Sequence, residues 1–455
     1  MDFNLSIKNF SNNVKLNTEQ IQKAIDECAS FGGGKIFFPK GEITIATVFI
    51  KSNVHIVLDE QTKILGSLNF DDYERDEKVD YPLYQDASHS FFNCSMFVAK
   101  NCENISITGK GVIDMQSVWD EENIRKIVHR GAKAIALKEC ENVYIDGITV
   151  NNCTDLAIYF AGCENVEISN VKMRTYIDGI SPDNSKNVKI HDCDIETGDD
   201  GIVFKSSYTL NRLDYCKDIR VWNCKVKSRC NAIKFGTETN GGFYDILIEN
   251  VDIRETRITG IAVESVDGAI IDGVTFRNIT MKNVGTPIFV YLGKRMRGPE
   301  GRQVGKIKNI TFENVTAEGE YVPYEVIEWH HISFVNKDTL QKPWVLNLPD
   351  YKGEDLTLTE KDCWQITSNI CGLKESPLEN ITLKNVTLKM DGGCKDNNIE
   401  IDETVRDYPE VYVYGRVLPA KGIYFRHVNG LTMENVKIET YREDVREDSV
   451  FYKVN

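Results

Sequence analysis

A column of acidic and amide side chains is the part of this sequence best suited to chemistry. Asp155, Asp178 and Asp200 each stand thirteen residues after a repeated asparagine, Asn231 holds the same place in the next repeat, and Asp199 precedes Asp200. If these positions stack in space, their like charges repel one another, which an ordinary surface avoids. Crowded carboxyl groups also push their pKa values apart, so that one can donate a proton while another accepts one. Hydrolysis of a glycosidic bond requires such an acid and base.

The elements that position this column come from an internal repeat. The segment Cys102–Ile107 recurs from Cys140 and from Cys163, and further copies follow. After each asparagine, apolar residues alternate with polar ones and then skip a position, which indicates short strands joined by bends. Asn165 and Asn187 are only 22 residues apart, which is too close for a helix between two parallel strands, a unit of about 30 residues. The repeat therefore predicts an all-β fold, a parallel β-helix.

The repeated asparagines and cysteines have a structural explanation. Asparagine at a fixed bend position is expected to stack on its equivalents and to pass amide hydrogen bonds along the column. The thirteen cysteines are odd in number and include no Cys-x-x-Cys pair, so we expect reduced, packed thiols and no metal site built from them. The amino terminus shows no pattern of a secretory signal, and together these features predict a cytoplasmic protein.

We expect one β-helix domain over residues 1–455. Residues 17–30 carry an N-cap candidate and apolar residues at helical spacing, which predicts a helix that caps the solenoid. Residues 320–375 interrupt the repeat with aromatic and charged residues, among them Trp329, His330 and His331. We expect an inserted loop region there, whose aromatic residues form either a rim that stacks on sugar or a small core of their own.

Charge and composition exclude several classes of partner. The formal net charge of −15 repels polyanions, so we expect neither nucleic acid nor a membrane surface as a partner. No run of about eighteen apolar residues occurs, which argues against a membrane span. The expected partner is an oligosaccharide substrate, bound by a monomer or a small homo-oligomer.

Several sequence landmarks occur in order along the chain. Residues 32–41 read Gly-Gly-Gly-Lys-Ile-Phe-Phe-Pro-Lys-Gly, residues 108–114 read Thr-Gly-Lys-Gly-Val-Ile-Asp, residues 177–180 read Ile-Asp-Gly-Ile, and residues 198–202 read Gly-Asp-Asp-Gly-Ile. In these motifs and their spacing the chain resembles glycoside hydrolase family 28, the polygalacturonases and their relatives, over nearly its whole length. The resemblance implies a right-handed β-helix with an open cleft, and a reaction that needs no cofactor and no metal.

The same resemblance assigns roles to the acidic residues. It implies that Asp199, the first of the aspartate pair, is the general acid. Asp178 and Asp200 then hold and deprotonate the attacking water, with inversion at the anomeric carbon. These three aspartates are the predicted catalytic residues, and Asp155 and Asn231 are predicted to bind substrate beside them.

The chain departs from the family pattern at two places. Where the family has Gly-His-Gly, this sequence reads Cys230-Asn231-Ala232, and an amide cannot titrate near neutral pH as an imidazole does. Where the family has Arg-Ile-Lys, which binds the carboxylate of galacturonate, this sequence reads Ala262-Val263-Glu264. A uronate there would be repelled, so a neutral sugar such as rhamnose is an alternative substrate.

Other polar residues could supply the missing specificity. Lys205 and Lys234 could reach substrate or could only neutralise the carboxylates, and Glu264 and Asp267 could contact sugar or be solvated. Arg295 is the best remaining candidate to bind a carboxylate. The full set predicted to bind substrate is Asp155, Lys205, Asn231, Lys234, Glu264, Asp267, Tyr291 and Arg295.

Three function classes fit these observations. We favour an exo-acting hydrolase of pectin-derived or related plant oligosaccharides, with residues 71–93 and 320–375 closing one end of its cleft. A lyase or epimerase on the same fold would need calcium and would lose activity with a chelator. A β-helix that only binds carbohydrate would keep its affinity when Asp199 is changed to asparagine. A solvated acidic stripe and a calcium site remain as plainer interpretations of the aspartate column.

Overall fold

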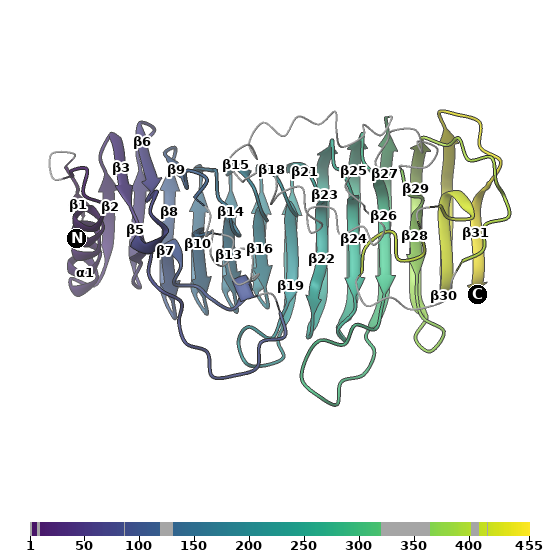
Figure 1. Cartoon of the computed structure of the whole chain (residues 1–455), viewed down its shortest axis with the longest axis horizontal. Helices are drawn as coiled ribbons and strands as arrows, with labels where there is room; N and C mark the ends of the chain where they lie inside the picture. The colour runs from purple at the N-terminus through teal and green to yellow at the C-terminus, as the bar shows by residue number, and fades with distance from the viewer. Residues whose placement is uncertain are drawn as a thin grey trace.

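The chain winds into a solenoid of parallel strands (Figure 1). The computed structural model describes residues 2–6, 10–85, 87–118, 131–319, 365–401, 409–415 and 417–455. Within these ranges the 31 strands form one continuous sheet that is coiled on itself, and each strand pairs with its equivalent one turn away. The predicted right-handed parallel β-helix is confirmed.

Each turn contributes a strand to up to three faces of the solenoid. We call the first the site face, and it consists of β4 (Val48–Phe49), β7 (Ser95–Lys100), β10 (Lys133–Lys138), β13 (Ile158–Ala161), β16 (Ile180–Asp183), β19 (Ile202–Ser206), β22 (Asn231–Thr239), β24 (Thr259–Ser265), β26 (Thr286–Leu292) and β28 (Ser368–Cys371). The second consists of β1 (Phe3–Asn4), β2 (Gly34–Phe38), β5 (Val54–Leu58), β8 (Glu103–Gly109), β11 (Glu141–Asp146), β14 (Glu164–Ser169), β17 (Lys186–His191), β20 (Tyr215–Trp222), β23 (Gly242–Arg254), β25 (Ile270–Lys282), β27 (Lys306–Glu318) and β29 (Leu378–Met390). The third consists of β3 (Gly41–Ile45), β6 (Thr62–Gly66), β9 (Val112–Asp114), β12 (Thr149–Asn151), β15 (Lys172–Thr175), β18 (Asp194–Thr197) and β21 (Lys225–Ser228). The last turns are β30 (Ala420–Thr440) and β31 (Glu447–Val454).

The repeated asparagines form the expected ladder along the solenoid. The amide nitrogen of Asn142 donates to the side-chain oxygen of Asn104 at 3.1 Å, Asn165 donates to Asn142 at 3.0 Å, and Asn187 donates to Asn165 at 2.6 Å. All four have φ between 50° and 56°, a left-handed conformation that asparagine tolerates better than most residues. The ladder therefore fixes both the bend and the spacing between turns.

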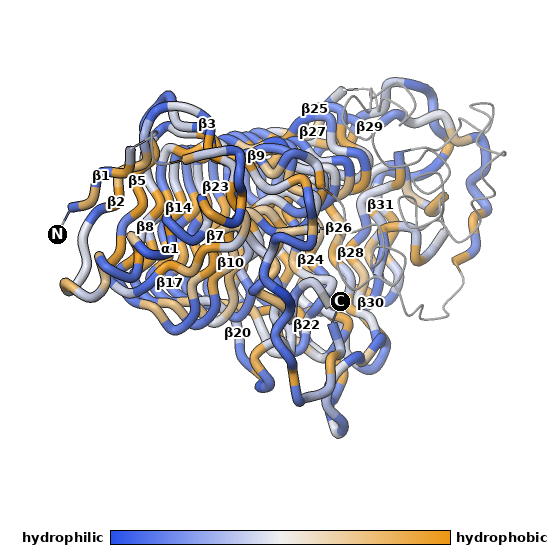
Figure 2. Tube along the Cα trace, turned by 60° about the vertical axis from the view of Figure 1, so that its left-hand side comes forward, coloured by the Kyte–Doolittle hydropathy of each residue, from blue (hydrophilic) through white to orange (hydrophobic). Residues whose placement is uncertain are grey.

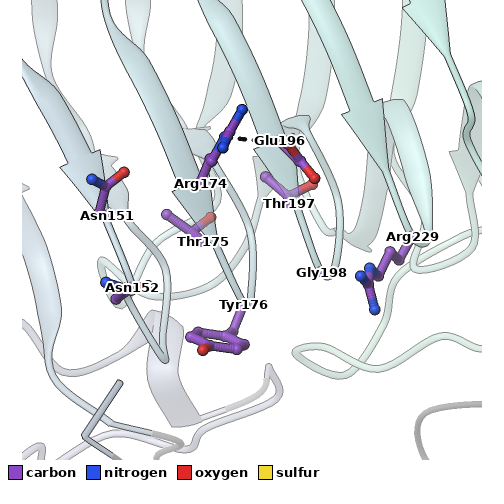
Figure 3. Close-up of a pocket in the computed structure, with 9 residues that line it drawn as sticks. All are labelled: Asn151, Asn152, Arg174, Thr175, Tyr176, Glu196, Thr197, Gly198 and Arg229. Carbon is purple, nitrogen blue, oxygen red and sulfur yellow. Dashed lines mark ion pairs between the residues drawn. The ribbon is translucent and has the colours of Figure 1, made fainter. Parts of the chain in front are cut away.

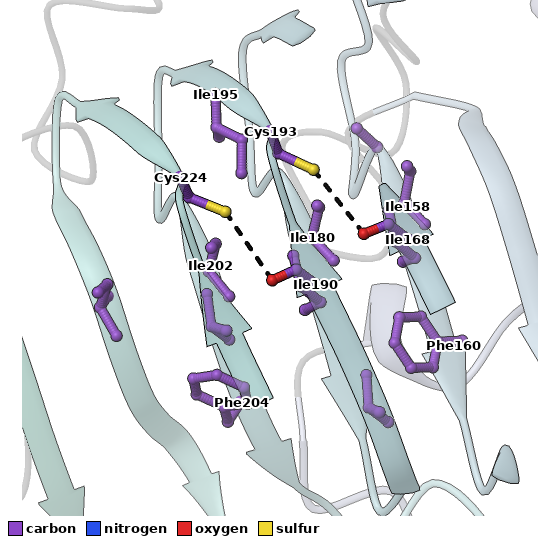
Figure 4. Packing of buried hydrophobic residues seen from close by; sticks show 14 of the residues in the cluster. Ile158, Phe160, Ile168, Ile180, Ile190, Cys193, Ile195, Ile202, Phe204 and Cys224 are labelled. Atoms are coloured by element: carbon purple, nitrogen blue, oxygen red, sulfur yellow. Dashed lines mark hydrogen bonds between the residues drawn. The ribbon is translucent and has the colours of Figure 1, made fainter. Parts of the chain in front are cut away.

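Apolar side chains fill the interior in columns. Figure 2 shows hydrophobic positions recurring from turn to turn, and Figure 4 shows isoleucines stacked between neighbouring strands. The thiols of Cys193 and Cys224 lie among them and contact the carbonyl oxygens of Ile168 and Ile190, each at 3.9 Å. The twelve cysteines in the described part of the chain are free, and ten of them are buried. They pack as small apolar side chains, as expected.

A helix covers the amino-terminal end of the stack, but it begins earlier than predicted. Helix α1 spans Val14–Ser30, and its N-cap is Asn13, whose side chain accepts from the backbone of Leu16. Asn17, the predicted start, is instead buried and donates to the carbonyl oxygens of Ser11 and Thr44. The two asparagines both suit an N-cap, and Asn17 instead ties the helix to β3. Within the described residues, no helix combines the length and apolar character that crossing a bilayer requires.

The predicted inserted region lies only partly within the described chain. Residues 320–364, with Trp329, His330 and His331, fall outside the described residues. The predicted end at residue 375 is wrong, because Ser368–Cys371 forms strand β28, which pairs with β26 and β30. The solenoid therefore resumes before the predicted boundary.

The segment between β6 and β7 leaves the solenoid and crosses its site face. It contains the short helices η2 (Phe70–Asp72) and η3 (Ala87–His89), and η3 lies in front of β13 and β16 in Figure 1. Tyr159 of β13 donates from its hydroxyl to the carbonyl oxygen of His89 at 2.7 Å. The hydroxyl of Ser88 also donates to Asp155, at 3.0 Å. These contacts hold the segment against the outer side of the site face.

We predict that Asn165→Ala weakens the solenoid by about 1–2 kcal/mol, because it removes a donor and an acceptor from the ladder. The free energy of unfolding in urea measures this. Asn211→Ala is the matched control, since Asn211 is an exposed residue with φ of 55° outside the ladder. An equal loss in both variants would contradict a stabilising role for the ladder.

Candidate active site

The register of the site face brings the aspartate column together. Ile180 of β16 pairs with Ile202 of β19, and Ile202 pairs with Ile233 of β22. Asp178 stands two residues before Ile180, and Asp200 stands two residues before Ile202. Equivalent positions on paired parallel strands lie about 4.8 Å apart. The bends that carry these aspartates are thus stacked directly on one another.

Glycine after each of these aspartates permits the close stacking. The backbone N–H of Gly179 donates to the carbonyl oxygen of Asp200 at 3.0 Å, and that of Gly201 donates to the carbonyl oxygen of Asn231 at 2.8 Å. A Cβ atom at Gly201 would lie 2.6 Å from the carbonyl oxygen of Ala232. A larger residue would therefore separate the turns at the point where the carboxylates meet.

Asp178, Asp199 and Asp200 converge as predicted. One carboxylate oxygen from each residue can be chosen so that all three lie within 4.8 Å of one another. Asp178 and Asp200 are 4% exposed, and the backbone N–H of Asp200 donates to Asp178 Oδ1 at 3.3 Å. This cluster is the only group of three or more such residues with metal-binding geometry within the described ranges. Its oxygens could hold a cation or divide the tasks of acid and base.

Two lysines on the outer side of the site face neutralise part of this charge. Lys205 Nζ lies 3.5 Å from Asp178 Oδ2, and Lys234 Nζ lies 3.4 Å from Asp200 Oδ2. Burial alone would lower the pKa of Lys205, but the neighbouring charges, first that of Asp178, raise it above its usual value. Lys205 therefore stays positively charged. Both lysines lie at the cluster, which is consistent with either predicted role.

Asn231 also lies at the cluster, with its amide held in one orientation. Its side-chain nitrogen donates to Asp200 Oδ1 at 2.7 Å, and its side-chain oxygen accepts from the hydroxyl of Thr259 at 2.5 Å. The amide is therefore a fixed hydrogen-bond donor to Asp200. It is suited to positioning that carboxylate, in addition to any contact with substrate.

Glu264 lies on the next turn and has no hydrogen-bond partner for one of its oxygens among the described residues. The residue is 1% exposed, and its Oε2 atom is the one without a partner. Burial raises the pKa of this carboxyl well above its usual value, and Glu410 adds to the shift while Lys234 opposes it. Glu264 is thus suited to the neutral acid form, in which it can donate a hydrogen bond.

Glu410 is an acidic neighbour of the cluster that the repeat did not indicate. It is 8% exposed and belongs to the segment 409–415, which packs against the site face. Burial raises the pKa of Glu410 to about 7, and the negative charges of Asp200 and Asp199 raise it as well, while Lys234 lowers it. Because Glu410 lies outside the repeat, no periodic signal in the sequence could have placed it here.

Asp155 does not join the cluster predicted from the repeat, and its contact with substrate stays a prediction. It is 0% exposed, its carboxylate lies 3.8 Å from Lys133 Nζ, and it accepts from Ser88. Ile158 pairs with Ile180, which makes Leu156, not Asp155, the partner of Asp178. Counting from the asparagine missed this slip of one residue, because the bend before β13 differs in length.

Three other predicted binding residues are also enclosed. Arg295 donates to both carboxylate oxygens of Asp267, from Nε at 2.9 Å and from Nη2 at 2.5 Å, and the two side chains are 4% and 1% exposed. Tyr291 is 1% exposed and stacks on Phe289 with 5.7 Å between ring centroids. Arg295, Asp267 and Tyr291 are thus enclosed by partners of their own, and their contact with substrate stays a prediction.

Apolar clusters cover the site face on both sides of the carboxylates. On the amino-terminal side, the side chains that face outward from β10 and β13 pack under the segment that crosses them, and the cluster comprises Phe92, Ala136, Leu156, Tyr159, Ala161, Tyr176, Ile177 and Leu210. On the carboxy-terminal side, a second cluster comprises Ala262, Val266, Phe289, Tyr291, Ile366, Cys371, Val411, Val413, Tyr414, Leu418, Ala420 and Tyr424. We call these the N-wall and the C-wall. Only the turns of β16, β19 and β22 remain between them.

A pocket of about 250 Å³ lies at the bends beside the cluster (Figure 3). It is lined in part by Gly198, which precedes Asp199, and by Tyr176 and Arg229. On its rim, Arg174 Nε lies 3.4 Å from Glu196 Oε2. The pocket is mainly a feature of the bends that enter the site face, next to the least buried carboxylate.

Similarity to known proteins agrees with this geometry. The model of the family described as "Glycosyl hydrolases family 28" matches residues 28–327. An exo-poly-alpha-D-galacturonosidase of Dickeya chrysanthemi is 26% identical over 325 residues, which cover 59% of this chain and 53% of that protein. The chain thus spans about half of that relative's length. An endo-polygalacturonase of Pectobacterium carotovorum subsp. carotovorum is 22% identical over 371 residues, which cover 77% and 86% of the two chains.

The same fold occurs in a solved structure. The family 28 exopolygalacturonase of Yersinia enterocolitica superposes with a TM-score of 0.66 and 20% sequence identity. The superposition covers 100% of this chain and 78% of that one. At this level of identity the likeness establishes the solenoid architecture.

We predict that Glu410 makes stability depend on pH. Its pKa rises from 4.5 to about 7 on folding, so the stability that it contributes is present below pH 4.5 and is lost as the pH rises through 7. In Glu410→Gln, this part of the pH dependence, on the order of 3 kcal/mol, should disappear. Urea unfolding at several pH values between 4.5 and 8 measures the change.

The exposed residue Glu434 provides the matched control. Glu434→Gln should show the same pH dependence as the unchanged protein. Identical curves for Glu410→Gln and the unchanged protein would refute the assignment.

Proposed function

The chain belongs to glycosyl hydrolase family 28, and from this membership we propose that it is an exo-acting, inverting hydrolase of pectin-derived or related plant oligosaccharides. The observation that carries the proposal is the convergence of Asp178, Asp199 and Asp200 within 4.8 Å on two stacked bends. The polygalacturonases among its relatives support pectin as the source of the substrate.

The three carboxyl groups have distinct roles in the proposed reaction. Asp199, the least buried, donates its proton to the glycosidic oxygen as the bond between that oxygen and the anomeric carbon breaks. Asp178 and Asp200 hold a water molecule, and one of them takes its proton as the water oxygen bonds to the anomeric carbon. Asn231 fixes the carboxylate of Asp200, and the two lysines balance part of the charge of Asp178 and Asp200.

The stereochemical outcome needs a direct measurement. The oxygens within 4.8 Å are closer than the separation of about 6.5–9.5 Å typical of inverting glycosidases. The proposal of inversion rests instead on the family resemblance. In that arrangement the water lies beside Asp178 and Asp200, so that it need not fit between the acid and the base. Proton NMR of the fresh product from a panel of pectic oligosaccharides decides between inversion and retention, and it also identifies the released sugar.

The N-wall and the C-wall support exo action. The segment predicted to close the cleft, residues 71–93, contributes Phe92 to the N-wall, and residues 409–415 contribute Val411 and Val413 to the C-wall. A long polysaccharide cannot run along the solenoid through both clusters. Only the end of a chain can enter between them, which favours removal of terminal sugars.

The same carboxylate geometry leaves a second candidate function. Three acidic oxygens within 4.8 Å could hold calcium, which a β-helix lyase would need to abstract a proton next to a uronate carboxylate. Such an enzyme would produce unsaturated sugars that absorb ultraviolet light and would stop when a chelator is added. A hydrolase should release saturated sugars at the same rate with and without the chelator.

We predict that Asp199→Asn lowers kcat by about 10²–10⁴-fold and leaves substrate affinity nearly unchanged, because only proton donation is lost. The measurements are turnover of pectic oligosaccharides and calorimetric binding. Asp194→Asn, an exposed residue on the preceding strand, should retain full turnover. Full activity in Asp199→Asn would exclude it as the acid.

We also predict that the enzyme releases only monosaccharide from an oligosaccharide labelled at its reducing end. The label should stay on a ladder of products, each one sugar shorter than the last. If labelled fragments that are several sugars shorter appeared before the product that is one sugar shorter, they would demonstrate cleavage within the chain.

A further inference from the structure

Glu238 lies against the catalytic cluster because strand β22 bulges. Phe204 of β19 pairs with Phe235, and Ser206 pairs with Thr239, so that one residue on β19 faces three on β22. The single residue is Lys205, and the three opposite it end with Glu238. Bulges of this kind redirect side chains and are frequent beside active sites. Here the bulge turns a carboxylate toward the lysine that already binds Asp178.

Lys205 bridges Glu238 to the catalytic carboxylates. Its Nζ atom lies 3.4 Å from Glu238 Oε2 and 3.5 Å from Asp178 Oδ2, and the three side chains are 5–6% exposed. Glu238 thus lies on the side of the bulge, separated from Asp178 by one lysine. Burial alone would raise the pKa of Glu238, but nearby positive charges, Lys205 first, lower it well below its usual value. Glu238 is accordingly ionised.

Two cations near the cluster are paired with carboxylates. Lys234 pairs with Asp200 at 3.4 Å, and Arg295 pairs with Asp267 at 2.5 Å. A carboxylate on the substrate that bound to Lys234 or Arg295 would have to displace one of these ion pairs, and at the cluster it would also face Glu238.

We propose that Glu238, held by Lys205, selects the sugar that enters between the N-wall and the C-wall, and that this sugar is an uncharged pyranose at the end of a pectin-derived oligosaccharide. The ionised carboxylate accepts hydrogen bonds from two neighbouring hydroxyl groups, and Lys205 donates to one of them. A uronate in the same place brings a second negative charge into a buried site. This proposal rests on the proposed hydrolase function and specifies its substrate class.

The test compares three substrates with the full-length protein. They are trigalacturonate, the same trisaccharide with all carboxyl groups methyl-esterified, and a pectic oligosaccharide with rhamnose at its non-reducing end. The first two differ in charge and by small methyl groups. The unchanged protein should prefer a substrate with a neutral end by at least about 10-fold in kcat/KM. A hydrogen bond to a charged group contributes more free energy than one between neutral groups, and a uronate end would lose it.

The substitution Glu238→Gln removes the charge and keeps the shape. It should lower kcat/KM for the neutral-ended substrate about 10–100-fold, mainly by raising KM, because hydrogen bonds to a charged group are lost. The ratio of kcat/KM for the neutral-ended substrate to kcat/KM for trigalacturonate should become smaller at the same time. If Glu238 only served as a counter-ion for Lys205, kcat/KM would fall equally for all substrates, and that result would overturn the proposal.

Two further variants keep the result interpretable. Glu249→Gln, on β23 where Glu249 lies 3.5 Å from Arg277, should leave the preference unchanged. Glu238→Asp retains the charge one methylene further away and should restore part of the discrimination. Thermal unfolding shows whether Glu238→Gln folds. If it does not, Glu238→Asp becomes the test variant, and its preference for the substrate with a neutral end should be weaker than that of the unchanged protein.

Binding separates the failure of this proposal from the failure of the hydrolase function. Calorimetry with Asp199→Asn, alone and combined with Glu238→Gln, measures affinity for the same substrates without turnover. A preference for neutral ends that depends on Glu238 supports the proposal even where no hydrolysis occurs. Preferred binding of trigalacturonate, or binding of none of the three, overturns it.

Discussion

The structure depends on the register between turns of the solenoid. Parallel pairing fixes each bend one strand spacing from the next, and the ladder of Asn104, Asn142, Asn165 and Asn187 holds that spacing on one edge. Because the bends before β16 and β19 are stacked, three aspartates from two turns become neighbours. A slip of one residue moves a side chain out of the group, as Asp155 demonstrates.

The second requirement is charge balance in a site with little access to water. Carboxylates crowded at this depth repel one another strongly, and the lysines that hold them come from the next turns of the same face. Lys205 and Lys234 each pair with one of the two deeper aspartates. In the proposed reaction, the least buried carboxyl, Asp199, is the acid that acts on the substrate. The sheet thus supplies acids and their counter-ions by the same stacking.

The sequence was sufficient for the fold and for the three aspartates, because both follow from a repeat whose period can be counted. It was insufficient wherever the repeat changed. Glu238 reaches the site through a bulge of two additional residues, and Glu410 reaches it from a segment outside the periodic pattern. Arg295 was expected to be available to substrate, but its partner Asp267 lies 28 residues earlier on the preceding turn. Sequence types alone do not reveal such pairings.

The two walls have a consequence for what happens after each cut. With the N-wall and the C-wall on both sides along the axis, a substrate of the proposed exo-acting enzyme would reach the carboxylates across the site face and not along it. In that reaction, the sugar released from the chain end would lie deepest and would leave after the shortened oligosaccharide has withdrawn. Each cleavage then requires complete dissociation and rebinding, so the enzyme should be distributive and should not remain on one chain through successive cuts. Accumulated monosaccharide would compete for the same entrance.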